Sequence, residues 1–289
     1  MARSALLVLI AVTSLFGACT HSEEQTFAFE SQIQPRGALR VTGFAGAITL
    51  HRDAVGTTVR GTYTVRTMGF DSTKAARDAA RRVTLAEAGD ASVMDLAVVL
   101  PSNATISRYA VDLDLAVPAG VVVSADNEVG PVLIDGLPVA DVTTSDGQVD
   151  LVATRGDAVI RTSNAAVTAE DHLGALDVRT SNGQLDLVRV VGDVRGTTSN
   201  GFVYCEAEPP YAGEVVLATT NAGVEVRLPF DFGAELAALT SPESTVFIQG
   251  LDFYPVYDVP GQLEGDLGDG AGLVDVRTTN GDVVFRSFR

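Results

Sequence analysis

The sequence has no tryptophan, three histidines and two cysteines among 289 residues, and these scarcities exclude several classes of protein. Two cysteines cannot form a disulfide scaffold, and the shortage of aromatic rings disfavours a sugar-binding cleft built on stacking platforms. Lys and Arg number 20 against 37 Asp and Glu, which gives a formal charge of −17. Because a phosphate backbone needs a basic face, we expect no nucleic-acid partner.

Long apolar runs are equally rare, and the one marked example lies at the N-terminus. It covers residues 5–16, follows Arg3, and at 12 residues is too short to span the ~30 Å hydrocarbon core of a bilayer. A positive residue followed by a short apolar run predicts a signal peptide, which we place at residues 1–18. Its removal, with Arg3, takes the formal charge from −17 to −18.

The end of this leader resembles a bacterial lipobox. Small residues stand directly before Cys19, although Phe16 departs from the aliphatic residue usual at its position. The resemblance implies cleavage before Cys19 and acylation of that residue, so the protein would be exported and held to a membrane by lipid. Thr20 resembles the residue found after the cysteine in outer-membrane lipoproteins, which implies an outer-membrane protein facing the periplasm or the cell surface.

The rest of the chain is dominated by a repeat. Variants of the pattern TSNGxLDL recur with steps of 18, 18, 18, 21 and 59 residues, and the last gap contains one degenerate copy from Leu236 and an insertion near residues 251–272. A regular period of this size indicates a solenoid, in which each coil covers the next. Each copy has an acidic or amide residue at its turn: Asp146, Asn164, Asn182, Asn200, Asn221 and Asn280.

Within each copy, apolar residues alternate with polar ones on both sides of the turn. Positions three and five after the turn residue are Val149 and Leu151 in the first copy, and comparable residues follow in the others. Alternation with period two predicts half-buried strands. The fold is therefore expected to be all-β, a single-domain β-helix or β-solenoid with coils of ~18 residues.

The turn residues are expected to form a structural ladder. Equivalent turns one coil apart lie ~4.8 Å from one another, so their side-chain amides can hydrogen-bond along the stack. This interpretation gives Asn164 and its equivalents no catalytic or metal-binding role, and we predict no catalytic residue, no metal and no cofactor.

The first half of the chain is less regular. Residues 26–33, 38–52 and 57–67 are predicted to be strands, and residues 72–88 a helix capped by Ser72 and ended by Gly89 and Asp90. We predict residues 19–35 to be the lipidated N-terminus and tether. Residues 36–289 are predicted to be the solenoid domain, with regular coils over about 121–289.

Several features together resemble a known family. They are the strand segment GAITL, a short basic helix, the strand AVDLDLAVPAGV, and the repeated TSNGxLDL and TTNGDVxF turns. In combination they resemble the bacterial putative-adhesin family of β-strand-repeat proteins of unknown function, over nearly all of residues 36–289. The resemblance implies a cell-envelope protein with a β-helical body and no established reaction.

Candidate chemistry is sparse. The three histidines lack metal-ligand spacing, Cys205 falls on the inward face of its strand, and Asp266 and Asp269 are expected to lie in a flexible acidic loop. The enzyme hypothesis with most support uses Asp150 and Asp186, outward carboxylates two coils apart at roughly 9.6 Å, which could act as an inverting pair on a polysaccharide. Solvated outward carboxylates are the competing interpretation.

Two outward aromatic residues interrupt the polar pattern. Phe202 and Tyr204 stand where other copies have Gln, Asp or Thr, and either the loop containing Tyr211 covers them or the three residues form an exposed binding patch. The favoured function is an envelope lipoprotein whose non-catalytic solenoid binds or scaffolds an unidentified protein or glycan. The alternatives are a carbohydrate-active hydrolase or lyase, and an accessory protein of an envelope-stress system.

Overall fold

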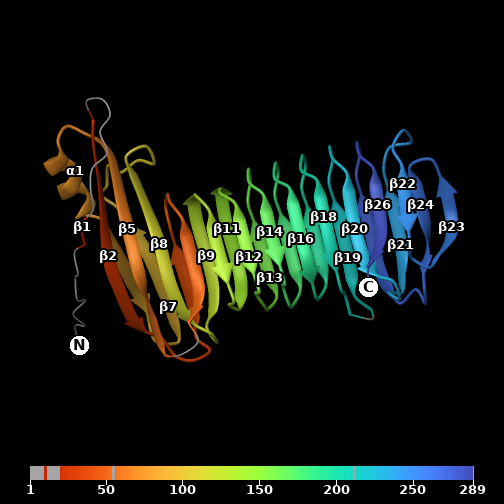
Figure 1. The fold of residues 1–289 in the computed structure, drawn as a ribbon, viewed down its shortest axis with the longest axis horizontal. Helices are drawn as coiled ribbons and strands as arrows, with labels where there is room; N and C mark the ends of the chain where they lie inside the picture. The colour runs from red at the N-terminus through yellow and green to blue at the C-terminus, as the bar shows by residue number, and fades with distance from the viewer. Residues whose placement is uncertain (1–9, 12–19, 54–55, 211, 289) are drawn as a thin grey trace. The chain divides into compact units, whose positions relative to one another are not determined.

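The computed structural model describes residues 10–11, 20–53, 56–210 and 212–288. Its contacts divide the chain into two units, residues 1–138 (unit 1) and 139–289 (unit 2), and strands make up most of both (Figure 1). Among the described residues, no helix has the length and apolar character needed to cross a bilayer. The predicted all-β solenoid with one short helix is confirmed. The predicted division into residues 1–18, 19–35 and 36–289 stays a prediction.

Unit 1 contains strands of two sheets. One runs β1-β2-β5-β8-β4-β10 and the other β9-β3-β7-β6. The pairs β1–β2, β2–β5, β5–β8 and β6–β7 are antiparallel, and β4 and β3 pair in parallel with their neighbours. The strands are β1 (Ile10–Ala11), β2 (His21–Gln32), β3 (Ala38–Thr42), β4 (Ile48–Asp53), β5 (Thr58–Phe70), β6 (Thr84–Gly89), β7 (Val93–Val99), β8 (Tyr109–Pro118), β9 (Val122–Val129) and β10 (Val132–Asp135).

The helix of unit 1 is shorter than predicted. α1 covers only Thr73–Ala80, with the Ser72 hydroxyl accepting a hydrogen bond from the Ala75 amide at 3.1 Å. The expected continuation to residue 88 is wrong, because Thr84–Gly89 forms β6 and pairs antiparallel with β7. This segment contains good helix formers, but its pairing with β7 makes it a strand, and local helix propensity does not reveal that pairing. Gly89 and Asp90 therefore make the β6–β7 turn and do not end a helix.

The segment expected to be a tether also contains regular structure. Residues 21–32 form β2, whose 12 residues pair with β5 from His21 opposite Phe70 to Gln32 opposite Thr58. The strand thus begins five residues before the predicted start at residue 26. β1 lies inside the predicted signal peptide, and Cys19 lies outside the described residues.

Unit 2 is a stack of coils. Each coil contributes one strand to each of two sheets, and the strands pair in parallel with a register shift of 18 residues, for example Val149 opposite Val167 and Val167 opposite Leu185. The first sheet runs β12 (Val149–Val152), β14 (Val167–Glu170), β16 (Leu185–Val190), β18 (Val203–Ala207), β20 (Val224–Pro229), β26 (Val283–Phe288) and β22 (Val246–Gln249). The second runs β11 (Val139–Asp146), β13 (Ala158–Arg161), β15 (Leu176–Arg179), β17 (Val194–Thr197), β19 (Glu214–Ala218), β25 (Gly272–Arg277), β21 (Ala234–Leu239), β24 (Gln262–Leu267) and β23 (Phe253–Val259).

The core of unit 2 follows the predicted alternation. Val149, Leu151 and their equivalents three and five residues after each turn are buried, and so are the residues four before each turn. The alternation is shifted at the start of β11, where Val139 is buried and Ala140, six residues before Asp146, is only half-buried. Burial of about four aliphatic side chains per coil supplies the hydrophobic free energy that a lone coil could not provide.

The last coils do not follow chain order. β25 and β26, from the C-terminal residues, pair with β19 and β20 on one side and with β21 and β22 on the other. The insertion at residues 251–272 contains β23 and β24, an antiparallel hairpin that joins the sheet through β21. The loop expected around Asp266 and Asp269 is wrong for Asp266, which is a strand residue opposite Glu235. Asp269 lies in the turn between β24 and β25.

Candidate functional site

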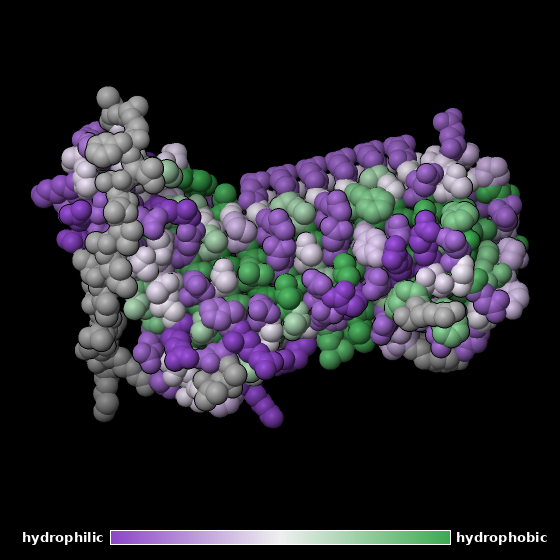
Figure 2. All heavy atoms as spheres, in the orientation of Figure 1, coloured by the Kyte–Doolittle hydropathy of each residue, from purple (hydrophilic) through white to green (hydrophobic). Residues whose placement is uncertain are grey.

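The predicted turn residues form an unbroken chain of hydrogen bonds. In every step the Nδ2 of one asparagine donates to the Oδ1 of the equivalent residue in the preceding coil of the stack, at 2.6 to 2.9 Å. The order is Asp146, Asn164, Asn182, Asn200, Asn221 and Asn280. Their side chains are exposed, and Figure 2 shows a regular hydrophilic row along one edge of unit 2. The ladder thus lies along an exposed edge of unit 2.

A second set of polar residues lies beneath the ladder. The threonines two positions before each turn residue are buried, and four of them donate through Oγ1 to a backbone carbonyl of a neighbouring turn at 2.7 to 3.2 Å. These four are Thr180, Thr198, Thr219 and Thr278. A buried hydroxyl that finds a partner stabilises the turn, which is a structural role.

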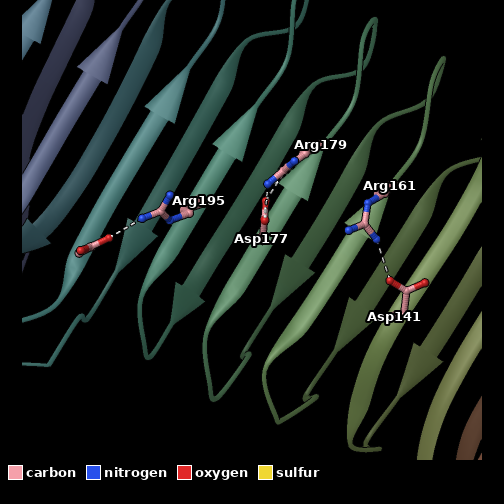
Figure 3. Close-up of polar contacts among 6 residues, drawn as sticks. Asp141, Arg161, Asp177, Arg179 and Arg195 are labelled. Carbon is pink, nitrogen blue, oxygen red and sulfur yellow. Dashed lines mark hydrogen bonds and ion pairs between the residues drawn. The ribbon is translucent and has the colours of Figure 1, made fainter.

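A row of ion pairs crosses the outer face of the second sheet. Figure 3 shows Arg161 with Asp141 at 2.9 Å, Arg179 with Asp177 at 2.8 Å, and Arg195, whose partner Glu214 is 2.7 Å away. All six side chains are at least partly exposed, so each pair contributes little to stability. These three arginines are neutralised locally, so they do not form a run of unpaired cations suited to a phosphate backbone.

The two carboxylates of the enzyme hypothesis occupy the predicted register. Asp150 lies opposite Thr168, which lies opposite Asp186, so the two are two coils apart on the outer face of the first sheet. Each accepts a hydrogen bond from the glutamine just before its strand, Gln148 at 2.7 Å and Gln184 at 2.9 Å. A groove lies on the other sheet, at the end of unit 2 formed by β21 and β24.

The aromatic residues Phe202 and Tyr204 lie on neighbouring outward positions. Phe202 is 40% exposed and packs over Gly223, whereas Tyr204 is half-buried, donates its hydroxyl to Glu206 and lies 5.3 Å from the Arg227 guanidinium. Desolvation raises the pKa of the Tyr204 phenol. The third predicted member, Tyr211, lies outside the described residues.

The loop proposed to cover these aromatics is not beside Phe202. β18 begins just after Phe202 and runs to Ala207, and the loop follows at its far end, where Glu208 bonds to Val190. The length of the strand separates the two by roughly 17 Å. Glu208, the first residue of this loop, therefore lies away from Phe202, and the expected cover through Tyr211 stays a prediction.

Cys205 and the histidines occupy unrelated places. Cys205 is fully buried on the inward face of β18, and burial raises the pKa of its thiol to about 12, so it is an unreactive core residue. His172 is buried at a coil corner, with Nδ1 2.9 Å from the Thr154 hydroxyl. His21 is exposed next to Thr73, and His51 is half-buried next to Asp114. Within the described ranges, no three His, Cys, Asp or Glu side chains are placed to hold a metal.

A group of exposed apolar residues in unit 2 was not predicted from the sequence. It lies on the outer face of β23, β24 and β21, which we call the terminal face. Because residues opposite one another point to the same side, Tyr254, Tyr257 and Val259 of β23 share this face with Asp266, Glu264 and Gln262 of β24 and with Glu235, Ala237 and Leu239 of β21. Tyr254 is 57% exposed and Val256, at a bulge in β23, is 78% exposed.

A groove of about 260 Å³ opens in the terminal face. Ala237 contributes only a methyl group to this face, and Glu235, Glu264 and Asp266 line the groove together with Leu236, Leu273 and Val256. The carboxylates can accept hydrogen bonds from hydroxyl or ammonium groups, and the apolar rim supplies area for contact. The sequence signal was the segment FYPVYDV within the insertion, with three aromatic residues in seven.

No family model and no curated protein matches the chain. Solved structures of similar fold include a putative adhesin from Bacteroides fragilis, with 8% identity, TM-score 0.40, and coverage of 91% of this chain and 97% of that chain. A putative cell adhesion protein from Clostridium sporogenes has 9% identity, TM-score 0.27 and coverage of 90% and 99%. A putative adhesin from Parabacteroides merdae has 8% identity, TM-score 0.26 and coverage of 91% and 96%.

Proposed function

We propose that this protein is an exported, lipid-anchored, adhesin-like binding module that performs no catalysis and uses the terminal face to bind its partner. The observation that carries the proposal is the exposed apolar surface of β23, formed by Tyr254, Val256, Tyr257 and Val259. Contiguous exposed apolar residues on an otherwise polar chain are typical of an interaction site. The partner is proposed to be a protein or glycan of the envelope or of a surface that the cell meets.

The arrangement of charge supports recognition over catalysis. The groove carboxylates lie around a shallow hollow beside exposed tyrosines, which suits hydroxyl-rich or cationic groups of a partner. Asp150 and Asp186, the carboxylates of the enzyme hypothesis, are held by glutamines on an outer face away from this groove. No observation favours a role in an envelope-stress system.

Binding can be tested with immobilised protein on a glycan array and on purified envelope proteins. Val256→Glu combined with Tyr257→Ser is expected to weaken any specific binding at least ten-fold, because it places a charge in the apolar contact. Phe202→Ser is the matched control, since Phe202 is an exposed aromatic away from the terminal face. Loss of binding with Phe202→Ser and retention with the β23 variant would move the site back to the predicted patch.

The anchor has a separate test in cells fed a labelled fatty acid. Cys19→Ala is expected to abolish incorporation of the label and to release the protein from the membrane fraction. Cys205→Ala, which removes the other cysteine, is expected to leave both unchanged. Incorporation that persists in Cys19→Ala contradicts the anchor.

A further inference from the structure

The folded body begins almost at the proposed lipidation site. Cys19 is joined to β2 by Thr20 alone, because β2 starts at His21. Consecutive Cα atoms lie ~3.8 Å apart, so the Cα of Cys19 is within about 8 Å of that of His21. If Cys19 carries acyl chains, as proposed above, the part of unit 1 around His21 has to lie against the bilayer surface.

Four element ends meet at this place. β2 and β5 are antiparallel with His21 opposite Phe70, and β5 and β8 are antiparallel with Thr67 opposite Tyr109. The start of β2, the end of β5 and the start of β8 therefore lie at one edge of the sheet, beside the first turn of α1 (Figure 1). The Thr73 hydroxyl of α1 lies 3.1 Å from Nδ1 of His21.

The side chains at this edge are apolar and cationic. Met68 is 44% exposed and Ile106 is 43% exposed. The Arg108 guanidinium lies 5.1 Å from the ring centroid of Phe70 and donates to the Gly69 carbonyl at 3.0 Å, while the Lys74 side chain extends into solvent. We call Met68, Phe70, Lys74, Ile106 and Arg108 the anchor edge.

The acidic residues near the anchor edge are partly neutralised. Glu23 accepts a hydrogen bond from Arg77 at 2.9 Å, and Asp78 lies 3.9 Å from the Lys74 ammonium, whereas Asp71 is exposed. The chain as a whole carries −17, so most of its surface is repelled by anionic lipid headgroups. An edge that combines exposed apolar residues with Lys and Arg is suited to the headgroup region.

We propose that the anchor edge is seated in the interfacial region of the phospholipid bilayer that holds Cys19, so that the lipid fixes the orientation of unit 1 as well as its location. The proposal rests on the proposed lipidation of Cys19. Ile106 and Met68 insert among the headgroups, and Lys74 and Arg108 contact lipid phosphates.

Because the sequence has no tryptophan, the fluorescence of a single introduced tryptophan can report its contact with lipid. Ile106→Trp makes the indole at residue 106 the sole one in the chain, in lipidated protein reconstituted into phosphatidylcholine–phosphatidylglycerol vesicles. The matched control is Val122→Trp, at an exposed position just beyond the opposite end of β8, roughly 30 Å from Tyr109. Brominated lipids are expected to quench the fluorescence of Ile106→Trp by about half and that of Val122→Trp hardly at all.

The outcomes separate the two proposals. Equal quenching, or equal absence of quenching, in the two variants while the lipidated protein stays on the vesicles overturns the seated edge and leaves the anchor intact. Membrane retention of the Cys19→Ala protein overturns the anchor itself. Met68→Trp, whose indole should be quenched like that of Ile106→Trp, keeps the test decisive if Ile106→Trp misfolds.

Discussion

The side chain of Asn280 donates a hydrogen bond to that of Asn221 at 2.9 Å, although 59 residues separate them. The ladder therefore steps over the degenerate repeat, whose strands β21 and β22 lie on the other side of the C-terminal coil. Extending the pairing of Leu239 with Arg277 places Pro242 opposite Asn280, where no amide can continue the ladder.

This coil order predicts which cysteine pairs can be oxidised. Asn221→Cys with Asn280→Cys places two thiols on adjacent turns, within the 4.4–6.8 Å Cα separation that a disulfide tolerates, at about 4.8 Å. We expect rapid crosslinking on mild oxidation, read by mass spectrometry. Asn221→Cys with Pro242→Cys, two coils apart at roughly 9.6 Å, is expected to stay reduced. The reverse pattern would mean that the coils stack in chain order.

The ladder has one direction, which predicts unequal effects of exchanging amide and carboxylate. Asn200 donates to Asn182 and accepts from Asn221. Asn200→Asp therefore removes the donor and leaves a carboxylate facing the side-chain carbonyl oxygen of Asn182. We expect a loss of about 1–2 kcal/mol in the free energy of unfolding. Asp146→Asn keeps the acceptor that Asn164 uses and should change stability by less than about 0.5 kcal/mol. Urea unfolding measures both, and equal losses would argue against a directional ladder.

His172 predicts a dependence of stability on pH. Burial lowers its pKa below 6.5, so the unfolded chain binds a proton at a higher pH than the folded chain does. Stability should therefore fall as pH drops from about 6.5 towards 5, a window in which carboxylates remain mostly ionised. His172→Gln is expected to flatten this slope in denaturant titrations. An unchanged slope in His172→Gln would assign the effect to other groups.

Cys205 predicts an unreactive thiol. Because burial raises its pKa to about 12, the folded protein should not react with a thiol reagent at pH 8, and the urea-unfolded protein should react fully. Cys205→Val, which introduces the residue type buried at the equivalent Val226, is expected to be tolerated. Cys205→Ser should cost about 1–3 kcal/mol, because it buries a hydroxyl in an apolar core. Rapid labelling of folded protein would contradict the burial.

The repetitive part of the fold could be predicted because its determinants are local. An 18-residue step and inward aliphatic pairs such as Val149 and Leu151 specify strand, turn and stacking in every copy. The helix prediction over residues 72–88 failed where local preference met a distant partner, since the choice of strand for residues 84–89 depends on β7. The order of the last coils likewise depends on a parallel pairing across 59 residues that no local pattern encodes.

The candidate site was harder to predict than the fold. Phe202 and Tyr204 drew attention because they break the repeat, yet Tyr204 is partnered by Glu206 and Arg227. Tyr254 and Val256 lie in an insertion without a repeat to compare with, and their exposure depends on the hairpin that brings β24 against β21. Binding surfaces formed by inserted segments become visible only when the register of the insertion is known.

The far end of unit 2 also determines whether molecules can join end to end. A solenoid that stopped at a bare coil would offer a long parallel edge on which further chains could polymerise as cross-β fibres. Here one edge is β23, which runs antiparallel to its neighbour and is interrupted by Pro255 and a bulge, and the other is β22, only four residues long. The hairpin and the short β22 therefore disfavour edge-to-edge strand addition at this end of unit 2.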